Sequence, residues 1–275
     1  MSYDRGYLTP VYFKMKFHFE YHTKSPNELE YNSKRVQDLL EKWGMRRHSY
    51  IKRFIYEEYF DYENDEHKFL LEFFKDENVR EEFKIQSDQN NWKELQGDIY
   101  DVAYEKVPCN LTTLHFFDRL YDAAIVRRES GAIVKTFPTY LEEDNSSPIM
   151  ITDELRKLLL LVDSPHYDIF SKDDRNEFMF RAFKSICLGG DMCQFEDFVS
   201  EYFNILKKIY KDLICVQKSR KTGDLIIKSF VYKINNLKNS NLFPSNNHNN
   251  FCYIVIDPVN RWVNVWYHAA YEYLC

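Results

Sequence analysis

The fold is decided by residues 251–268, whose sequence is FCYIVIDPVNRWVNVWYH. Two apolar runs, Phe251–Ile256 and Trp262–His268, lie on either side of the segment Asp257-Pro-Val-Asn260. Proline at position 258 fixes the φ angle that the first central position of a β-turn requires. Aromatic and β-branched residues on both sides of such a turn predict a β-hairpin.

A second hairpin is predicted just before the first. Leu213–Lys218 and Leu225–Ile234 flank Lys221-Thr-Gly-Asp224, whose glycine favours a tight turn. Between the two hairpins, residues 235–250 contain eight asparagines. A low-complexity segment of this kind predicts a long, mobile surface loop that is an insertion and not a functional site.

The first part of the chain predicts further strands. From Val11 to Tyr21, aromatic and aliphatic residues alternate with polar ones, which is typical of a half-buried strand. Two aromatic stretches follow, Tyr50–Phe60 and Lys68–Lys75, separated by the acidic segment 61–66. They can form a hairpin, although periodicity alone does not distinguish such short runs from helices.

The middle of the chain has helical periodicity, and its clearest period spans Phe195–Tyr210. Ser171 and Asp174 predict a capping box that opens a helix. Thr152, which two acidic residues follow, predicts the N-cap of another helix. Periodicity also predicts helices over Asn32–Trp43 and Leu111–Tyr121, and a strand over Gly131–Thr136.

Strands at both ends with helices between them predict an α+β protein. We expect a mostly antiparallel sheet, built from N-terminal strands and C-terminal hairpins, with a central helical layer. We also expect a single domain over residues 1–275. A subdivision into a strand-rich part, 1–105, and a part with the helices and the C-terminal hairpins, 106–275, stays open, because periodicity does not show whether both parts contribute to one sheet.

Composition excludes several classes of function. The chain has 37 Lys+Arg and 43 Asp+Glu, a net charge of −6, which argues against binding nucleic acid or anionic membranes. The seven glycines stand in none of the spacings of phosphate-binding loops or of the serine-hydrolase turn. No apolar run reaches the about 18–20 residues of a membrane helix, so we expect a cytosolic location. The six cysteines form no C-x-x-C pair and are expected to be reduced thiols.

Two groups of residues resemble metal or redox sites, but each has a simpler explanation. His18, Glu20 and His22 alternate along a predicted strand, as zinc ligands can, yet lysines on the same face repel a cation and a fourth ligand is lacking. Cys187 and Cys193 bracket a Gly-Gly turn, where a packed corner between helices suits them better than a metal or redox pair. We therefore expect no metal and no cofactor.

Catalysis is not expected either. His115 with Asp118 and Asp122 resembles an acid–base site, but no nucleophile motif accompanies it, and an ion-pair cluster around Arg119 explains the same residues. The charged segment Asp153–Lys157 begins either a partner-docking helix or a buried helix whose first turn complements the helix dipole. We therefore expect that the protein is not an enzyme.

A series of short motifs stands in the order known from one protein family. They are Phe73–Val79, Val107–Cys109, Phe116–Asp122, Ile125–Arg127, Asp153–Arg156, Tyr167–Ser171, Ile186–Gly190, Gln194–Asp197 and Ile209–Leu213. In these motifs the chain resembles the cilia- and flagella-associated protein 300 family. The resemblance covers about residues 70–270 and is most specific over residues 150–215.

The resemblance implies a role in the assembly of outer and inner dynein arms of motile cilia, without catalytic residues. We expect a non-enzymatic adaptor of the cytoplasm and of the motile cilium and its axoneme. The implied partners are dynein-arm subunits, dynein assembly factors including a kintoun-type co-chaperone, and the intraflagellar transport machinery, with no nucleic acid and no membrane. The alternative is a permanent structural component of the motile axoneme.

Partner binding is expected from charged and aromatic residues within the family-like motifs, because interfaces are enriched in such side chains. The candidates are Arg119, Tyr121, Asp122, Asp153, Arg156 and Asp191.

Overall fold

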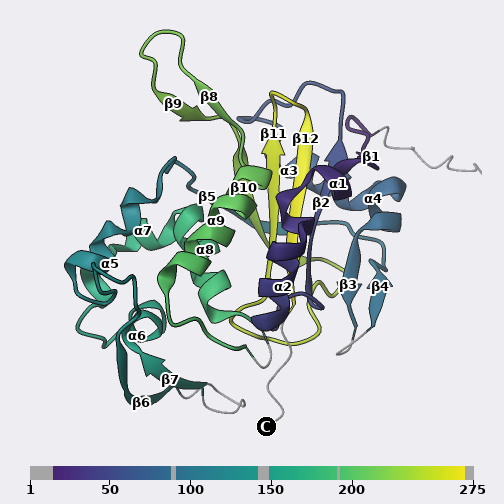
Figure 1. Ribbon diagram of the computed structural model, residues 1–275. Helices are drawn as coiled ribbons and strands as arrows, with labels where there is room; N and C mark the ends of the chain where they lie inside the picture. The colour runs from purple at the N-terminus through teal and green to yellow at the C-terminus, as the bar shows by residue number, and fades with distance from the viewer. Residues whose placement is uncertain (1–14, 88–90, 142–148, 191–192, 270–275) are drawn as a thin grey trace, which may run out of the picture.

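The structure is a computed structural model of the 275-residue chain and describes residues 15–87, 91–141, 149–190 and 193–269. In these ranges the chain forms nine helices and twelve strands, which pair mostly antiparallel. The main sheet stands between helices on either side (Figure 1). The predicted α+β class is therefore confirmed.

One six-stranded antiparallel sheet, in the order β1-β2-β12-β11-β10-β5, forms the centre of the molecule (Figure 1). Its strands are β1 (Glu20–Tyr21), β2 (Ser49–Ile55), β5 (Val102–Val107), β10 (Phe230–Leu237), β11 (Phe251–Asp257) and β12 (Trp262–His268). The predicted hairpin is confirmed, because β11 and β12 pair along their whole length. β2 pairs with β12 and β5 pairs with β10, so strands from both ends of the chain share one sheet.

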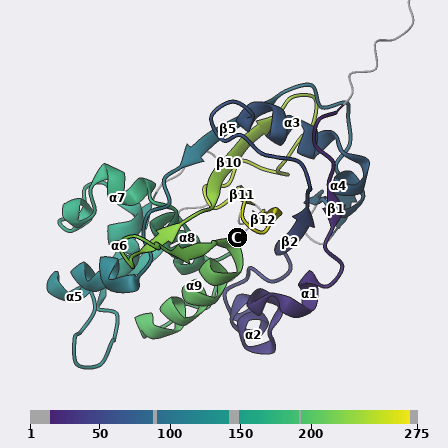
Figure 2. The ribbon, with the colours of Figure 1, turned by 90° about the horizontal axis from the view of Figure 1, so that it is seen from above.

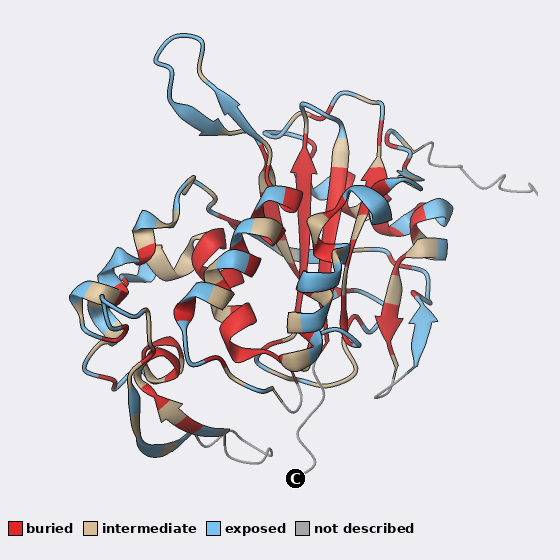
Figure 3. Ribbon diagram, viewed as in Figure 1, coloured by how far each residue is buried: buried red, intermediate tan, exposed pale blue. Residues whose placement is uncertain are grey.

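The sheet separates two hydrophobic cores, and β11 contributes to both. Tyr253 and Val255 belong to the first core, whereas Ile254 and Ile256 belong to the second. The first core takes side chains from α2 (Lys34–Lys42), α6 (Glu154–Leu160), α8 (Phe178–Leu188) and α9 (Val199–Leu213), and the second from α3 (Glu66–Lys75) and α4 (Glu77–Glu82). Figure 2 shows α2, α8 and α9 on one side of the strands and α3 and α4 on the other. Because both faces are covered, every residue of β11 is buried (Figure 3).

Three two-stranded ribbons lie outside the main sheet. They are β3 (Lys84–Gln86) with β4 (Trp92–Glu94), β6 (Lys135–Leu141) with β7 (Ile149–Asp153), and β8 (Val216–Lys218) with β9 (Leu225–Ile227). Short helical pieces complete the fold: α1 (Ser25–Glu28), α5 (Arg119–Asp122), α7 (Lys172–Asn176) and the 3-10 turns η1 (Glu30–Asn32), η2 (Leu114–Asp118) and η3 (Tyr167–Ile169). The β8–β9 pair confirms the second predicted hairpin, but its strands are shorter than predicted. Leu213 ends α9, and the residues from Phe230 belong to β10 of the main sheet.

The strand predicted over Val11–Tyr21 is only partly formed, and its first residues lie outside the described residues. In the described part, strand pairing is confined to β1. Phe17 and Phe19 are nevertheless fully buried, as their alternation predicts. The Phe17 N–H donates to Glu72 over 2.8 Å and the Phe19 N–H to Asp76 over 3.2 Å. Carboxylates at the facing helix ends therefore take the place of a neighbouring strand.

The two aromatic stretches after residue 49 do not form a hairpin. The first contains β2, but Lys68–Lys75 lies in the helix α3. Phe69 and Phe73 stand one helical turn apart and both pack edge-on against Phe19, with ring centroids 5.1 Å away in each case. The helical alternative is correct because this spacing brings both rings to the same side of α3.

The helices predicted in the middle of the chain are confirmed at α9 and at the capping box. The Asp174 N–H donates to Ser171 Oγ over 3.1 Å, and the Ser171 N–H donates to Asp174 Oδ2 over 2.9 Å. The helix after this box breaks at Glu177, which separates α7 from α8. Two helices, α7 and α8, therefore take the place of one.

Three other boundaries differ from the prediction. The N-cap of α6 is Asp153 and not Thr152, since Asp153 Oδ1 accepts the Arg156 N–H over 2.8 Å. The helix predicted over 111–121 is the 3-10 turn η2 followed by the single turn α5. The segment Gly131–Thr136, predicted as a strand, makes isolated bridges at Ala132 and Ile133, and β6 begins only at Lys135.

The asparagine-rich segment 235–250 is anchored to the interior. Its first residues belong to β10, and Asn249 is 5% exposed. The Asn249 side-chain amide donates to the carbonyl oxygens of Ser185 and Gly189 over 3.2 and 2.5 Å. Tyr267 Oη donates to the Leu242 carbonyl over 2.9 Å. Composition does not reveal these anchors, because each depends on a partner far away in the sequence.

A buried polar cluster fixes the end of α9 against the sheet. Arg53 of β2 donates through Nε to Asn264 Oδ1 over 2.8 Å and through Nη2 to the Asp212 carbonyl over 2.9 Å. The Asp212 carboxylate accepts the backbone N–H groups of Glu30 and Tyr31 over 3.0 and 2.7 Å. A guanidinium is well placed there because carbonyl groups at a helix C-terminus carry partial negative charge. This cluster sets the position of α9, on which the site described next depends.

Candidate functional site

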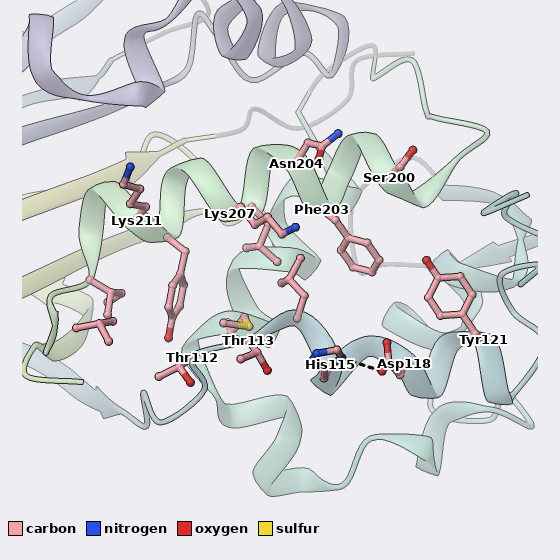
Figure 4. A pocket seen from close by; sticks show the side chains of 16 residues that line it. Thr112, Thr113, His115, Asp118, Tyr121, Ser200, Phe203, Asn204, Lys207 and Lys211 are labelled. Carbon is pink, nitrogen blue, oxygen red and sulfur yellow. Dashed lines mark hydrogen bonds and ion pairs between the residues drawn. The ribbon is translucent and has the colours of Figure 1, made fainter. Parts of the chain in front are cut away.

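A cavity of about 830 Å³ lies between α9 and the segment Thr112–Tyr121, which contains η2 and the start of α5 (Figure 4). We call it the α9 groove. Its lining residues come from five parts of the fold: Thr112, Thr113, Leu114, His115, Asp118 and Tyr121; Met179; Ser200, Phe203, Asn204, Leu206, Lys207, Tyr210 and Lys211; Ile214; and Val216.

One wall of the groove is the outer side of α9. The helix is amphipathic, and residues such as Tyr202, Ile205 and Ile209 are fully buried against the first core. Ser200, Asn204, Lys207 and Lys211 are spaced by three or four residues and line the groove as one exposed row.

The other wall is held to α9 by aromatic packing. Phe117 of η2 is fully buried, and its ring centroid lies 4.4 Å from that of Phe183 and 5.5 Å from that of Phe203. Tyr210 Oη donates to the Leu111 carbonyl over 2.7 Å and ties the start of this wall to α9. These contacts leave His115 exposed on the groove side of the 3-10 turn.

The floor of the groove is apolar. It is formed by Leu114, Met179, Phe203, Leu206, Tyr210, Ile214 and Val216. In Figure 4 the rings of Phe203 and Tyr121 point toward each other at one end of the groove. An open cavity with an apolar floor and polar edges can take up apolar side chains of a partner.

The structure brings one sequence-predicted residue, Tyr121, into the groove. Its neighbour Arg119 donates through Nη1 to Asp174 Oδ2 over 2.6 Å and to the Ile169 carbonyl over 3.2 Å, so it links α5 to α7. Asp122 forms an exposed ion pair with Arg128. Of these three candidates, Tyr121 alone lines the groove.

Asp153 and Arg156 lie in the interior, where the exposed fractions of their side chains are 0% and 2%. They form an ion pair with each other, and the guanidinium carbon of Arg156 lies 3.2 Å from the centroid of the Phe195 ring. Of the two alternatives for this helix, the structure has the buried one, since Leu155, Leu158 and Leu159 belong to the first core. Neither charged side chain is available to a partner. Asp191 lies outside the described residues.

The acid–base arrangement around His115 consists of a single exposed pair. His115 Nδ1 lies 3.1 Å from Asp118 Oδ2, and the His115 side chain is 86% exposed. Asp122 contacts Arg128 instead, and Arg119 contacts Asp174. The ion-pair explanation therefore fits the geometry, although Arg119 takes its partner from another helix.

The possible metal and redox residues are engaged elsewhere. His18 Nδ1 lies 2.9 Å from Glu58, and His22 Nδ1 lies 3.6 Å from Glu28. Within the described ranges, no three His, Cys, Asp or Glu side chains gather as metal ligands. Burial raises the pKa of the Cys193 thiol to about 12 and that of Cys187 further, which makes both unreactive at neutral pH.

Sequence reasoning did not identify the groove, because its two walls meet only in the folded chain. One residue could have indicated the groove from the sequence. Phe203 lies on α9 between the apolar stripe and the polar row, at a position where a helix of a globular protein usually carries a polar side chain.

None of the helices in the described ranges combines the length and apolar composition that a bilayer crossing requires.

No solved structure matches this chain significantly, whereas known sequences do. The sequence model of the family described as cilia- and flagella-associated protein 300 matches residues 16–268. The chain is similar to cilia- and flagella-associated protein 300 of Chlamydomonas reinhardtii, with 34% identity over 253 residues that cover 90% of this chain and 96% of that relative. It is also similar to the protein of the same name from Paramecium tetraurelia, with 31% identity over 243 residues that cover 86% of this chain and 90% of that relative. The chain therefore belongs to the cilia- and flagella-associated protein 300 family.

Proposed function

We propose that this protein is a non-enzymatic adaptor for the assembly and transport of outer and inner axonemal dynein arms. The observation that carries the proposal is the family match, which spans nearly all described residues and associates the chain with cilia and flagella. A cytoplasmic pool beside the ciliary one is part of the proposal, since arms are assembled before transport.

The α9 groove supports a binding role. Leu114, Phe203 and Val216 of its apolar floor are at least partly exposed. Its edges carry hydroxyl, amide, ammonium and imidazole groups that can form hydrogen bonds with a partner. The proposed partners are dynein-arm subunits, dynein assembly factors such as a kintoun-type co-chaperone, and the intraflagellar transport machinery. Nucleic acids and membranes are not among them.

The titratable groups of the groove favour binding over proton transfer. Burial raises the pKa of the phenol of Tyr121, and burial raises that of Tyr210 much further. Both phenols therefore stay protonated at neutral pH. The exposed pair of His115 with Asp118 has no positioned nucleophile among the other groove residues.

A gene knockout in a ciliated cell tests the proposal. Electron tomography of the mutant axonemes should show the loss of both outer and inner arms. A tagged copy, isolated from the cytoplasm of cells that regrow their cilia, should bring down dynein chains together with assembly factors. Intact arms in the knockout would contradict the proposal.

Extraction of isolated axonemes tests the alternative, a permanent axonemal component. An adaptor should be released by detergent and moderate salt, whereas a structural subunit should stay with the doublet microtubules. Recovery of the protein only with axonemal proteins would favour the structural alternative.

A further inference from the structure

A row of exposed cations continues from the α9 groove onto the β8–β9 ribbon. It consists of Lys207, Lys211, Lys218, Arg220 and Lys221. Within the described part of the chain none of the five forms an ion pair, whereas the neighbouring Lys208 is paired with Glu30 over 2.7 Å. Residues 213–228 contain a single acidic residue, Asp224. A protein with a net charge of −6 thus carries a segregated basic strip.

The ribbon is a direct extension of the groove. β8 follows the C-terminal end of α9, and its first residue, Val216, lines the groove. Figure 1 shows the ribbon projecting from the body of the molecule beyond α9, and Figure 3 shows that it is mostly exposed. The exposed fractions of Val216 and Leu225 are 39% and 56%, so the apolar floor also continues outward.

Strand register decides which ribbon residues continue the groove. Val216 lies opposite Ile227, and Lys218 lies opposite Leu225. Paired residues and residues two positions apart share one face of a ribbon, so these four side chains lie on the same face. That face is turned toward the body, because Ile227 packs against the first core. Lys218 and Leu225 therefore follow Val216 along the groove.

The tip of the ribbon is a closed turn that contains Arg220 and Lys221. The Ser219 N–H donates to the Asp224 carbonyl over 2.7 Å, and the Gly223 N–H donates to the Ser219 carbonyl over 2.9 Å. Gly223 has a φ of 78°, which glycine adopts without strain. Arg220 and Lys221 belong to this turn, so the basic strip extends to the outer end of the ribbon.

The dimensions of the groove limit what can fill it. Its lining follows α9 from Ser200 to Ile214, which corresponds to about 21 Å at the rise of an α-helix. Lys207 and Lys211 stand one turn apart along this length. A helix of about 14 residues with one apolar face and acidic residues along its flank matches the length, the floor and the charge.

We propose that the α9 groove and the β8–β9 ribbon together bind an acidic, amphipathic helix of a partner protein. Apolar side chains of this helix occupy the floor, and its carboxylates face Lys207, Lys211 and the ribbon. The inference rests on the proposed function in one respect: the partner is taken to be a component of dynein-arm assembly. Tyr121 and Phe203 give bases a stacking surface, but the aliphatic residues Leu114 and Val216 lie in the same lining and the protein has a net charge of −6. Single-stranded nucleic acid is therefore a poorer match than an amphipathic helix.

Selection from a displayed library of random 16-residue peptides on the full-length protein tests the inference. The recovered peptides should be rich in Asp and Glu and should carry apolar residues at helical spacing. Their binding should weaken about tenfold or more between about 0.1 M and about 1 M NaCl, because the Debye length falls from about 10 Å to about 3 Å.

Charge variants locate the binding surface. Lys207→Glu with Lys211→Glu should weaken peptide binding about tenfold or more, and Lys207→Gln with Lys211→Gln should weaken it less. The matched control is Lys75→Glu with Lys172→Glu, which makes the same charge change at exposed lysines of α3 and α7 and should leave binding unchanged. Thermal melting of all variants checks that each one is folded.

Three outcomes would overturn the inference: recovered peptides without net negative charge, equal binding by the charge-reversed variant, or tighter binding of a 15-nucleotide oligothymidylate than of any peptide. The selection is independent of the knockout. If the selection fails, the proposed role in arm assembly is not affected. If the knockout has intact arms, the proposed peptide specificity of the groove is not affected.

Discussion

Glu72 and Phe17 are joined by a hydrogen bond in which the backbone N–H of Phe17 donates to Glu72 Oε2 over 2.8 Å. The N–H of Lys16 donates to the same oxygen over 2.9 Å. One carboxylate oxygen of α3 thus satisfies two consecutive backbone donors, one of which belongs to a fully buried residue. Buried N–H groups without an acceptor are costly, so this contact holds the N-terminal segment on the second core.

Glu72→Ala should lower the free energy of unfolding by about 1–3 kcal/mol, because two backbone donors lose their acceptor. Glu72→Gln should cost less, since a single amide oxygen can accept both N–H groups. Urea denaturation measures both effects. Glu81→Ala, at an exposed position of α4, is the control and should change stability little. Equal losses for the two Glu72 variants would contradict this assignment.

His268 should make stability depend on pH. Burial lowers the pKa of its imidazole from 6.5 to about 4, while its Nδ1 lies 2.8 Å from the Asn249 carbonyl oxygen. The unfolded chain therefore takes up a proton at a higher pH than the folded protein. The stabilisation is complete above pH 6.5 and is lost as the pH falls toward 4, by about 3 kcal/mol in total.

Urea denaturation between pH 4 and 7 measures this dependence. His268→Asn keeps a donor near the Asn249 carbonyl and should flatten the profile in this window. His115→Asn, at a side chain that is 86% exposed, should leave the profile unchanged. A profile of His268→Asn as steep as that of the wild type would assign the dependence to other groups.

Arg156→Ala should lower the free energy of unfolding by about 3–5 kcal/mol, because the carboxylate of Asp153 would stay buried without its counter-charge. Asp153→Asn combined with Arg156→Met removes both charges, keeps an N-cap oxygen for α6 and fills the space. This double variant should therefore be more stable than Arg156→Ala alone. Thermal and urea denaturation measure the difference, and the opposite order would contradict the assignment of the pair to the interior.

Tyr121→Ala should weaken the capture of partners from regrowing cells, because its ring closes one end of the α9 groove. Asp122→Ala should have a small effect, since this side chain forms an exposed ion pair with Arg128 and does not line the groove. Quantitative mass spectrometry of the captured proteins compares the two variants. Equal capture by wild type and Tyr121→Ala would remove this residue from the binding surface.

The parts of the fold that sequence patterns predict are those with local causes. The turn at Pro258 and the buried strands beside it form as expected, and so do the period of α9 and the capping box at Ser171. In each case the residues that make the structure are neighbours in the chain, so their spacing contains the information.

The parts that patterns miss depend on distant partners. The segment around Phe17 alternates like a strand, but Glu72 and Asp76 provide its acceptors from other elements. Lys68–Lys75 is rich in phenylalanine, which suits either type of element, and packing against the sheet decides for the helix. Arg156 is a residue type that is common at interfaces, yet it lies in the interior, where its guanidinium packs on the ring of Phe195 from another segment.

The pairing of β2 with β12 has a consequence for synthesis of the protein on the ribosome. Ile55 lies opposite Trp262, and Ser49 lies opposite His268. β2 is therefore synthesised more than two hundred codons before the strand with which it pairs. Until then, both aromatic cores lack the hairpin that separates them, and their rings are open to water and to other chains. A nascent chain that stops before residue 251 lacks β11 and β12, the two middle strands of the sheet, and we expect it to depend on chaperones or to be degraded.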